Sequence, residues 1–127
     1  MMFQVGLVAL GGAIGASLRY LSGVAALRLV GSAFPWGTLF ANVLGSLLMG
    51  LLFAWFAKRT GGATTELRLF FATGVLGGFT TFSAFSLDAL TLIERGALSA
   101  AAGYISASVI LSITAIFIGL WFGRAFL

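Results

Sequence analysis

The recurrence of long apolar segments is the feature that most constrains how this chain can fold. Each segment is long enough to cross, as an α-helix, a hydrocarbon core about 30 Å thick. The 127 residues include only seven Lys or Arg and three Asp or Glu, too few to cover the surface of a soluble domain. We therefore expect an all-α membrane protein with a single transmembrane domain over residues 1–127. Its four predicted spans are about residues 3–27, 35–57, 67–93 and 98–122.

The residue types that the chain lacks argue against several classes of function. The chain has no cysteine and no histidine, which removes thiolate metal sites, the usual general base and the usual zinc ligand. Its sequence offers no nucleophile–base pair, so we do not expect an enzyme. The net charge of +4 is scattered rather than concentrated in a basic run, which gives little support to nucleic-acid binding.

A glycine- and hydroxyl-rich stretch, residues 74–86, interrupts the third apolar segment. Each of its three glycines weakens a helix by about 1 kcal/mol relative to alanine. Non-helical backbone is tolerated at membrane depth only inside protein or beside a wet cavity, and broken helices commonly build ion sites there. The stretch predicts a broken third helix, although a glycine-rich packing surface is the alternative. Side-chain partners for any freed backbone groups are available from Thr80, Thr81, Ser83 and Ser86.

The second segment carries a polar stripe, because Thr38, Asn42 and Ser46 recur every four residues and share one helix face. An asparagine at membrane depth needs hydrogen-bond partners. One interpretation is a hydrogen bond between helices, and the other is a donor along a polar pathway, since the amide offers two N–H groups. The sequence leaves both interpretations open.

The fourth segment carries a second stripe, formed by Tyr104, Ser108 and Ser112 at the same four-residue interval. Serine in a membrane helix often donates back to its own helix, so an isolated serine would indicate little. Three aligned hydroxyls opposite another polar stripe favour a polar pathway between the second and fourth helices.

Two charged residues lie within predicted spans. Arg19 either extends to the near interface or lines a vestibule that attracts anions. Asp88 lies near one end of its span, which favours an interfacial or vestibule position. A pathway lined by hydroxyls, an amide and phenylalanine edges, with no deep carboxylate, suits a small anion, because a carboxylate would repel it.

Positive charges are almost balanced between the two sides of a four-span chain. Lys58, Arg59, Arg68 and Arg124 would lie with the termini. Arg28 and Arg95 would lie on the opposite side, together with Arg19 if it extends to that interface, so the difference is one or two charges. The positive-inside rule then mildly favours cytoplasmic termini. So small a bias permits insertion in both orientations, and hence an antiparallel dimer with a two-fold axis in the membrane plane.

Three motifs closely resemble the Fluc fluoride channels, also called the CrcB family. They are residues 11–19 (GGAIGASLR), 36–45 (WGTLFANVLG) and 77–86 (GGFTTFSAFS), and the resemblance extends over the whole chain. It implies an antiparallel, dual-topology homodimer that passively exports toxic fluoride across the inner (cytoplasmic) membrane of a microbe. One departure is Ala84, where many members carry threonine.

The resemblance also implies roles for individual residues. It places Arg19 and Asp88 in the vestibule, and assigns a structural sodium ion (Na⁺) at the dimer axis to the backbone carbonyls of Gly77 and Thr80. Two carbonyls from each chain would suit such a hard cation. The expected anion pathway consists of Asn42, Thr81, Phe82, Phe85, Tyr104, Ser108 and Ser112.

Other functions fit the sequence less well. A small proton-coupled multidrug-type exporter, or a fluoride/proton exporter, needs a carboxylate embedded in the membrane, and Asp88 lies too near a span end to serve comfortably. A scaffold protein would explain the small-residue ridges but not two polar stripes together with a helix break.

Overall fold

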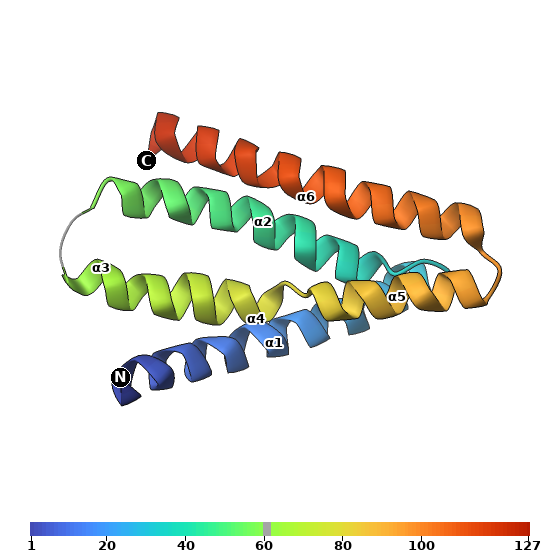
Figure 1. The fold of residues 1–127 in the computed structure, drawn as a ribbon, viewed down its shortest axis with the longest axis horizontal. Helices are drawn as coiled ribbons and strands as arrows, with labels where there is room; N and C mark the ends of the chain where they lie inside the picture. The colour runs from blue at the N-terminus through green and yellow to red at the C-terminus, as the bar shows by residue number, and fades with distance from the viewer. Residues whose placement is uncertain (60–61) are drawn as a thin grey trace.

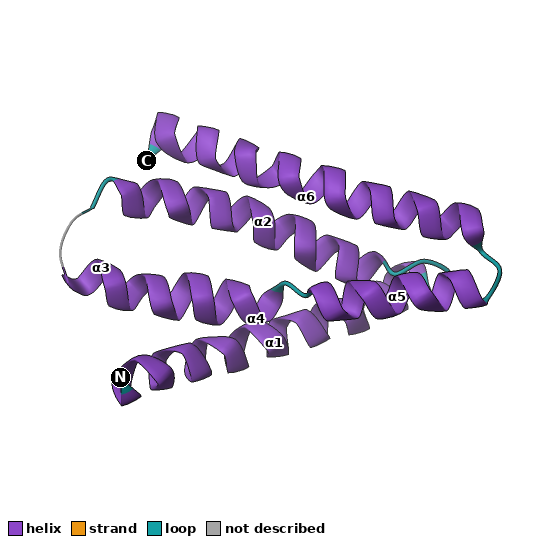
Figure 2. Ribbon diagram, in the orientation of Figure 1, coloured by secondary structure: helices purple, strands orange, loops and turns teal. Residues whose placement is uncertain are grey.

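The computed structural model describes residues 1–59 and 62–127. The described residues form helices and short connections, with no strand among them (Figure 2). Residues 60–61, in the predicted polar loop, lie outside the described residues. The elements are α1 (Met2–Val30), α2 (Trp36–Ala57), α3 (Gly62–Leu67), η1 (Arg68–Leu76), α4 (Gly77–Phe79), α5 (Phe82–Glu94) and α6 (Leu98–Phe126).

Four helical stretches are long and apolar enough to cross a membrane. This confirms the prediction of an all-helical chain with four long apolar helices. The third stretch is composite, since α3, η1, α4 and α5 follow one another along it. Both chain ends lie at the same end of the bundle, as four crossings require (Figure 1). The stretches are Met2–Val30, Trp36–Ala57, Thr65–Glu94 and Leu98–Phe126.

Glycine permits a tight turn in two of the connections between helices. Gly31 ends α1 with φ of 84°, and its N–H donates to the Leu27 carbonyl at 3.1 Å. Gly96 follows α5 with φ of 79°. Positive φ is strained for residues with a side chain, so glycine permits these abrupt turns at the same end of the bundle.

Close backbone packing joins α1 to the first half of the third stretch. Gly11 and Gly15 are buried in this contact. A Cβ atom added to Gly11 would lie 2.9 Å from the Cα of Gly74, and one added to Gly78 would lie 3.1 Å from the Cα of Gly12. Small residues allow two membrane helices to approach this closely. On the other side of the bundle, α2 packs along α6 (Figure 1).

Segment η1 is wound as a π-helix, which the sequence pattern did not predict. At its end the Gly77 N–H donates to the Ala72 carbonyl, five residues back rather than four. π-Helical turns are often found near functional sites. Here the π-helical segment includes the first residues of the glycine- and hydroxyl-rich stretch, 74–76.

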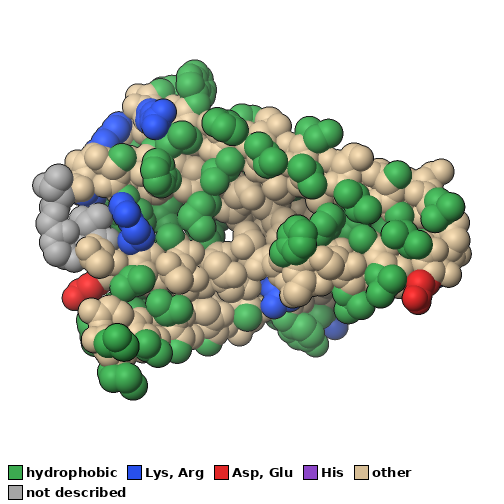
Figure 3. Space-filling model, viewed as in Figure 1, with side chains coloured by type: hydrophobic (Ala, Val, Ile, Leu, Met, Phe, Trp, Pro, Cys, Tyr) green, Lys and Arg blue, Asp and Glu red, His purple; other side chains and the backbone are tan. Residues whose placement is uncertain are grey.

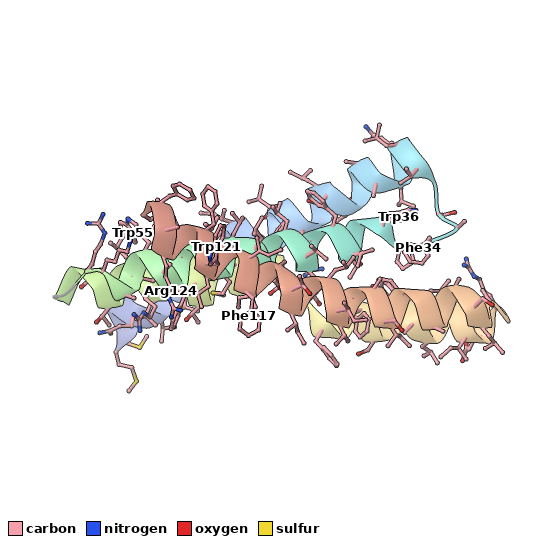
Figure 4. The ribbon with its side chains drawn as sticks, turned by 90° about the horizontal axis from the view of Figure 1, so that it is seen from above. Phe34, Trp36, Trp55, Phe117, Trp121 and Arg124 are labelled. Carbon is pink, nitrogen blue, oxygen red and sulfur yellow. The ribbon has the colours of Figure 1, made fainter. Side chains whose placement is uncertain are left out.

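The outer surface of the bundle is apolar, as expected of a protein in lipid. On α6 the large side chains of Ile110, Phe117 and Trp121 are exposed. Hydrophobic side chains cover much of the visible face, while several Lys and Arg side chains gather at one end (Figure 3). Trp36 lies toward one end of the bundle and Trp55 toward the other, a spacing typical of interfacial anchors (Figure 4).

Candidate anion pathway

The backbone leaves the helical conformation between α4 and α5. Thr80 has φ of −84° and ψ of 155°, and Thr81 has φ of −155° and ψ of 123°. Both residues are therefore extended, and the connection appears as a short loop within the third stretch (Figure 2). Such an interruption withdraws several N–H and C=O groups from the helical hydrogen-bond pattern.

Asn42 of α2 replaces one of the lost hydrogen bonds and adds a second one to the same residue. Its Nδ2 donates to the Thr81 carbonyl at 3.0 Å, and the Thr81 N–H donates to its Oδ1 at 2.7 Å. The amide therefore satisfies both backbone groups of one extended residue. This is a hydrogen bond between helices, the first of the two interpretations of Asn42, and it leaves a second Nδ2–H for another acceptor.

Hydroxyl groups satisfy other backbone groups at the interruption. The Thr81 Oγ1 accepts from the Ala84 N–H at 3.1 Å and so caps α5. The same oxygen lies 3.2 Å from the Ser83 Oγ. The Thr80 hydroxyl donates to the Leu76 carbonyl at 3.0 Å. The Leu76 carbonyl also accepts from the Thr80 N–H at 3.0 Å, so it is the Thr81 hydroxyl that supplies a partner for a backbone group freed by the interruption.

Arg19 also contacts the interrupted stretch. Its Nε donates to the Gly78 carbonyl at 3.3 Å, in a half-buried position. This contact directs the guanidinium toward the protein rather than along the lipid-facing surface, because Gly78 packs closely against α1. The bond joins α1 to the end of α4, beside the extended residues.

Two carbonyls at the interruption are left without their usual helical donors. In a continuous helix the Gly77 carbonyl would accept from the Thr81 N–H, and the Thr80 carbonyl from the Ala84 N–H. Both N–H groups instead donate to side-chain oxygens. Gly77 is exposed and Thr80 half-buried, so their carbonyls can accept from outside the chain.

A cavity of about 340 Å³ opens between α2, the interruption and α6. Six of the seven predicted pathway residues line this cavity: Asn42, Thr81, Phe82, Phe85, Ser108 and Ser112. The rest of the cavity wall is largely apolar and includes Met49, Val109, Ile113 and Ile116, which the sequence pattern did not identify.

The hydroxyls of Ser108 and Ser112 are buried but have no hydrogen-bond partner among the described residues. Other hydroxyls in the chain behave differently: Ser86 donates to the Phe82 carbonyl at 3.0 Å, and Thr91 to the Leu87 carbonyl at 2.9 Å. A buried polar group without a partner is costly. Ser108 and Ser112 are therefore free to donate to a guest in the cavity.

Tyr104 does not line this cavity. It is fully buried, and its hydroxyl donates to the Asp88 Oδ2 at 3.0 Å. Its ring centroid lies 5.2 Å from that of Phe85 and 5.4 Å from that of Phe34, the latter in an edge-on arrangement. Phe34 was not identified from the sequence, because an isolated phenylalanine in a loop carries no distinguishing pattern.

A second cavity, of about 350 Å³, lies toward the end of the bundle formed by the first loop. Arg19 and Asp88 both line it, together with Thr38 and Trp36. Tyr104 contacts Asp88 of this cavity and packs on Phe85 of the first cavity, so it lies between the two.

Comparison with known proteins agrees with the motifs. A family described as "CrcB-like protein, Camphor Resistance (CrcB)" matches residues 6–120. A relative from Agrobacterium fabrum, named fluoride-specific ion channel FluC, is 58% identical over 123 residues, which cover 97% of this chain and 98% of the relative.

Two further relatives carry the same name. The protein from Mesorhizobium japonicum is 56% identical over 124 residues, 98% of each chain. The protein from Hyphomonas neptunium is 57% identical over 118 residues, 93% of each chain. With the matched region extending over nearly the whole sequence, this chain belongs to the CrcB-like protein family.

Proposed function

We propose that this multi-pass membrane protein is a fluoride-specific ion channel that exports toxic fluoride passively. The observation that carries the proposal is the pair of buried, unpartnered hydroxyls, Ser108 and Ser112, on the wall of a cavity in the middle of the bundle. Relatives that match nearly the whole chain are named fluoride-specific ion channels.

The cavity wall suits a small anion. Hydroxyls and the second Asn42 N–H can donate to fluoride as it sheds water. No Asp or Glu is among the residues that line this cavity, so no carboxylate repels an anion there. Phe82 and Phe85, whose ring centroids lie 5.4 Å apart, can turn their positive edges toward it.

The assembly that we propose for this function is an antiparallel, dual-topology homodimer. Thr81 and Ser83 form an exposed polar pair within the third membrane-spanning stretch, beside extended backbone. Such groups are stable at membrane depth only when protein or a wet cavity covers them. Phe82 is also 77% exposed beside this pair, and a second copy would cover both.

The dimer would hold a structural Na⁺ through carbonyls from both copies. The described residues contain no cluster of three His, Cys, Asp or Glu for a metal. The Gly77 and Thr80 carbonyls, whose usual helical donors bond elsewhere, fit a hard cation that prefers oxygen ligands. Sodium would supply positive charge at the centre of the dimer.

Passive conduction is favoured over proton-coupled export, the alternative function. Coupling needs a carboxylate that both the proton and the substrate can reach in turn. Asp88 lies outside the first cavity and accepts a hydrogen bond from Tyr104. We place the channel in the inner membrane, where it would release fluoride from the cytoplasm.

The experiment that tests this function is fluoride efflux from liposomes, measured with and without the potassium carrier valinomycin. A passive channel moves charge, so we expect rapid efflux only when valinomycin lets potassium follow. Efflux that instead follows an imposed proton gradient without valinomycin would contradict the channel and support coupled transport. Asp88→Asn would then be the first variant to measure.

A further inference from the structure

One end of the molecule carries a cluster of cations that the anion pathway does not use. The cluster consists of Lys58 and Arg59 after α2, Arg68 at the start of η1 and Arg124 in the last turn of α6. All four residues are exposed. They lie at the end of the bundle that holds both chain termini, where Lys and Arg side chains gather in the space-filling view (Figures 1 and 3). We call this set the basic end.

Contacts within the basic end hold the side chains in place without neutralising them. The Lys58 Nζ donates to the Arg124 carbonyl at 3.2 Å, which joins the ends of α2 and α6. The guanidinium carbon of Arg59 lies 4.0 Å from the ring centroid of Trp55, and that of Arg68 lies 5.4 Å from the ring centroid of Phe56. A guanidinium over an aromatic ring keeps its N–H edge available for other acceptors.

The charge balance leaves this end positive. The partners described above are a carbonyl and two aromatic rings rather than carboxylates. Glu66, which is exposed, is the acidic residue nearest in sequence to Arg68. At the opposite end, the Arg95 Nη2 donates to the Ala33 carbonyl at 3.0 Å.

The basic end also lies at the depth of lipid headgroups. Trp55, Trp121 and Arg124 all lie toward this end of the bundle (Figure 4), and the Arg59 guanidinium lies over the Trp55 ring. Tryptophan concentrates at the membrane–water interface, so cations next to these rings meet the phosphate layer. Arginine binds phosphate oxygens through paired N–H groups, and lysine adds a point charge.

We propose that the basic end is a binding site for an anionic phospholipid headgroup, of the phosphatidylglycerol class. Lys58 has two further N–H groups after its bond to Arg124, and the guanidinium of Arg59 is already oriented by Trp55. A zwitterionic headgroup carries its own ammonium group, which these cations repel. The lipid would bridge the ends of α2 and α6, because Lys58 and Arg59 follow α2 and Arg124 is in the last turn of α6.

The test measures lipid binding to the intact protein in detergent by native mass spectrometry. The probes are dioleoyl phosphatidylglycerol, dioleoyl phosphatidylcholine and free glycerol phosphate. We expect phosphatidylglycerol to bind preferentially, and the double variant Lys58→Gln/Arg59→Gln to weaken its binding by about tenfold, because each cation near a membrane surface contributes measurably to anionic lipid binding.

Two controls separate the site from general charge effects. Arg28→Gln removes an exposed cation from the opposite end and should leave phosphatidylglycerol binding unchanged. Lys58→Arg keeps the charge and the donors, so it should retain binding even if Lys58→Gln/Arg59→Gln folds poorly.

Three results would overturn the proposal. Equal binding of phosphatidylglycerol and phosphatidylcholine would show that the site does not select an anionic headgroup. If Arg28→Gln lost as much phosphatidylglycerol binding as Lys58→Gln/Arg59→Gln, the binding site would not be at the basic end. Glycerol phosphate that competes as strongly as the lipid would make the basic end a site for free phosphate instead.

Discussion

Asn42 illustrates how one residue can make an interrupted membrane helix tolerable. Its amide accepts from the Thr81 N–H, which has left its helical acceptor, and donates to the Thr81 carbonyl. The same side chain lines the central cavity. A single residue therefore links the stability of the interruption to the chemistry of the pathway.

Replacing Asn42 by alanine should lower both stability and fluoride flux. The variant leaves the half-buried N–H of Thr81 without its partner, at a cost of about 1–3 kcal/mol, and also removes the bond to the Thr81 carbonyl. Thermal unfolding in detergent and fluoride efflux are the measurements. Thr91→Ala is the control, because it removes an exposed bond to the Leu87 carbonyl of its own helix and should change neither. An Asn42→Ala protein with unaltered melting temperature would contradict the structural role.

Removing the hydroxyl of Ser108 should lower flux without lowering stability. The group has no protein partner to lose and is costly to bury, so Ser108→Ala should melt at or above the temperature of the unmodified protein. A hydrogen bond to a charged group contributes about 1.5–3 kcal/mol, so fluoride flux should fall by about tenfold or more. Efflux from liposomes measures this fall.

Ser106→Ala provides the matched control for Ser108→Ala. Ser106 lies on the same helix but is exposed and does not line the cavity. The fluoride flux of Ser106→Ala should remain normal. If Ser108→Ala conducts as well as Ser106→Ala, the Ser108 hydroxyl has no part in conduction.

At the scale of the helices, the glycines of α1 determine how closely the third stretch can approach. Gly11 and Gly12 are adjacent in sequence but face different surroundings. A Cβ on Gly11 would lie 2.5 Å from the Phe70 carbonyl oxygen and 3.0 Å from the Val75 nitrogen, whereas a Cβ on Gly12 would meet nothing within 4 Å.

Gly11→Ala should therefore destabilise the protein, and Gly12→Ala should not. The new methyl group of Gly11→Ala meets backbone atoms, which cannot rotate away, so we expect a loss of about 1–3 kcal/mol as α1 moves off η1. Thermal unfolding of the two variants under identical conditions tests this difference. Equal melting temperatures would show that α1 and η1 are less closely packed than the structure describes.

The elements differ in how far the sequence could predict them. Four apolar segments and the two polar stripes follow from hydropathy and four-residue spacing, which are local properties. The bonds from Asn42 to Thr81 and from Arg19 to Gly78 join residues 39 and 59 positions apart, which local patterns cannot pair. The π-helical winding of η1 was missed because it depends on backbone packing rather than on hydropathy.

At the scale of the whole molecule, polar groups follow one another through the bundle. Arg19 and Asp88 line the cavity near the first loop, Tyr104 bonds Asp88, and the central cavity begins at Phe85. These four residues come from helices α1, α5 and α6. A continuous route across the membrane needs the second copy that we propose, because Phe82 and its polar neighbours face outward in one chain.

Phe82→Ile should sharply reduce fluoride flux and leave the proposed dimer intact. Isoleucine remains apolar but lacks an aromatic edge for an anion to meet. Phe82 is 77% exposed in one chain, so few contacts within that chain are lost. Fluoride efflux and size-exclusion chromatography are the two measurements. A dimeric variant with near-normal flux would remove the Phe82 ring from the mechanism.

The most direct test of the central claim is the selectivity of purified protein in liposomes loaded with fluoride or with chloride. With potassium flow provided by valinomycin, we expect rapid loss of fluoride and retention of chloride. Fluoride that stays trapped in liposomes holding folded protein would contradict this expectation, and the two polar stripes would then serve helix packing alone.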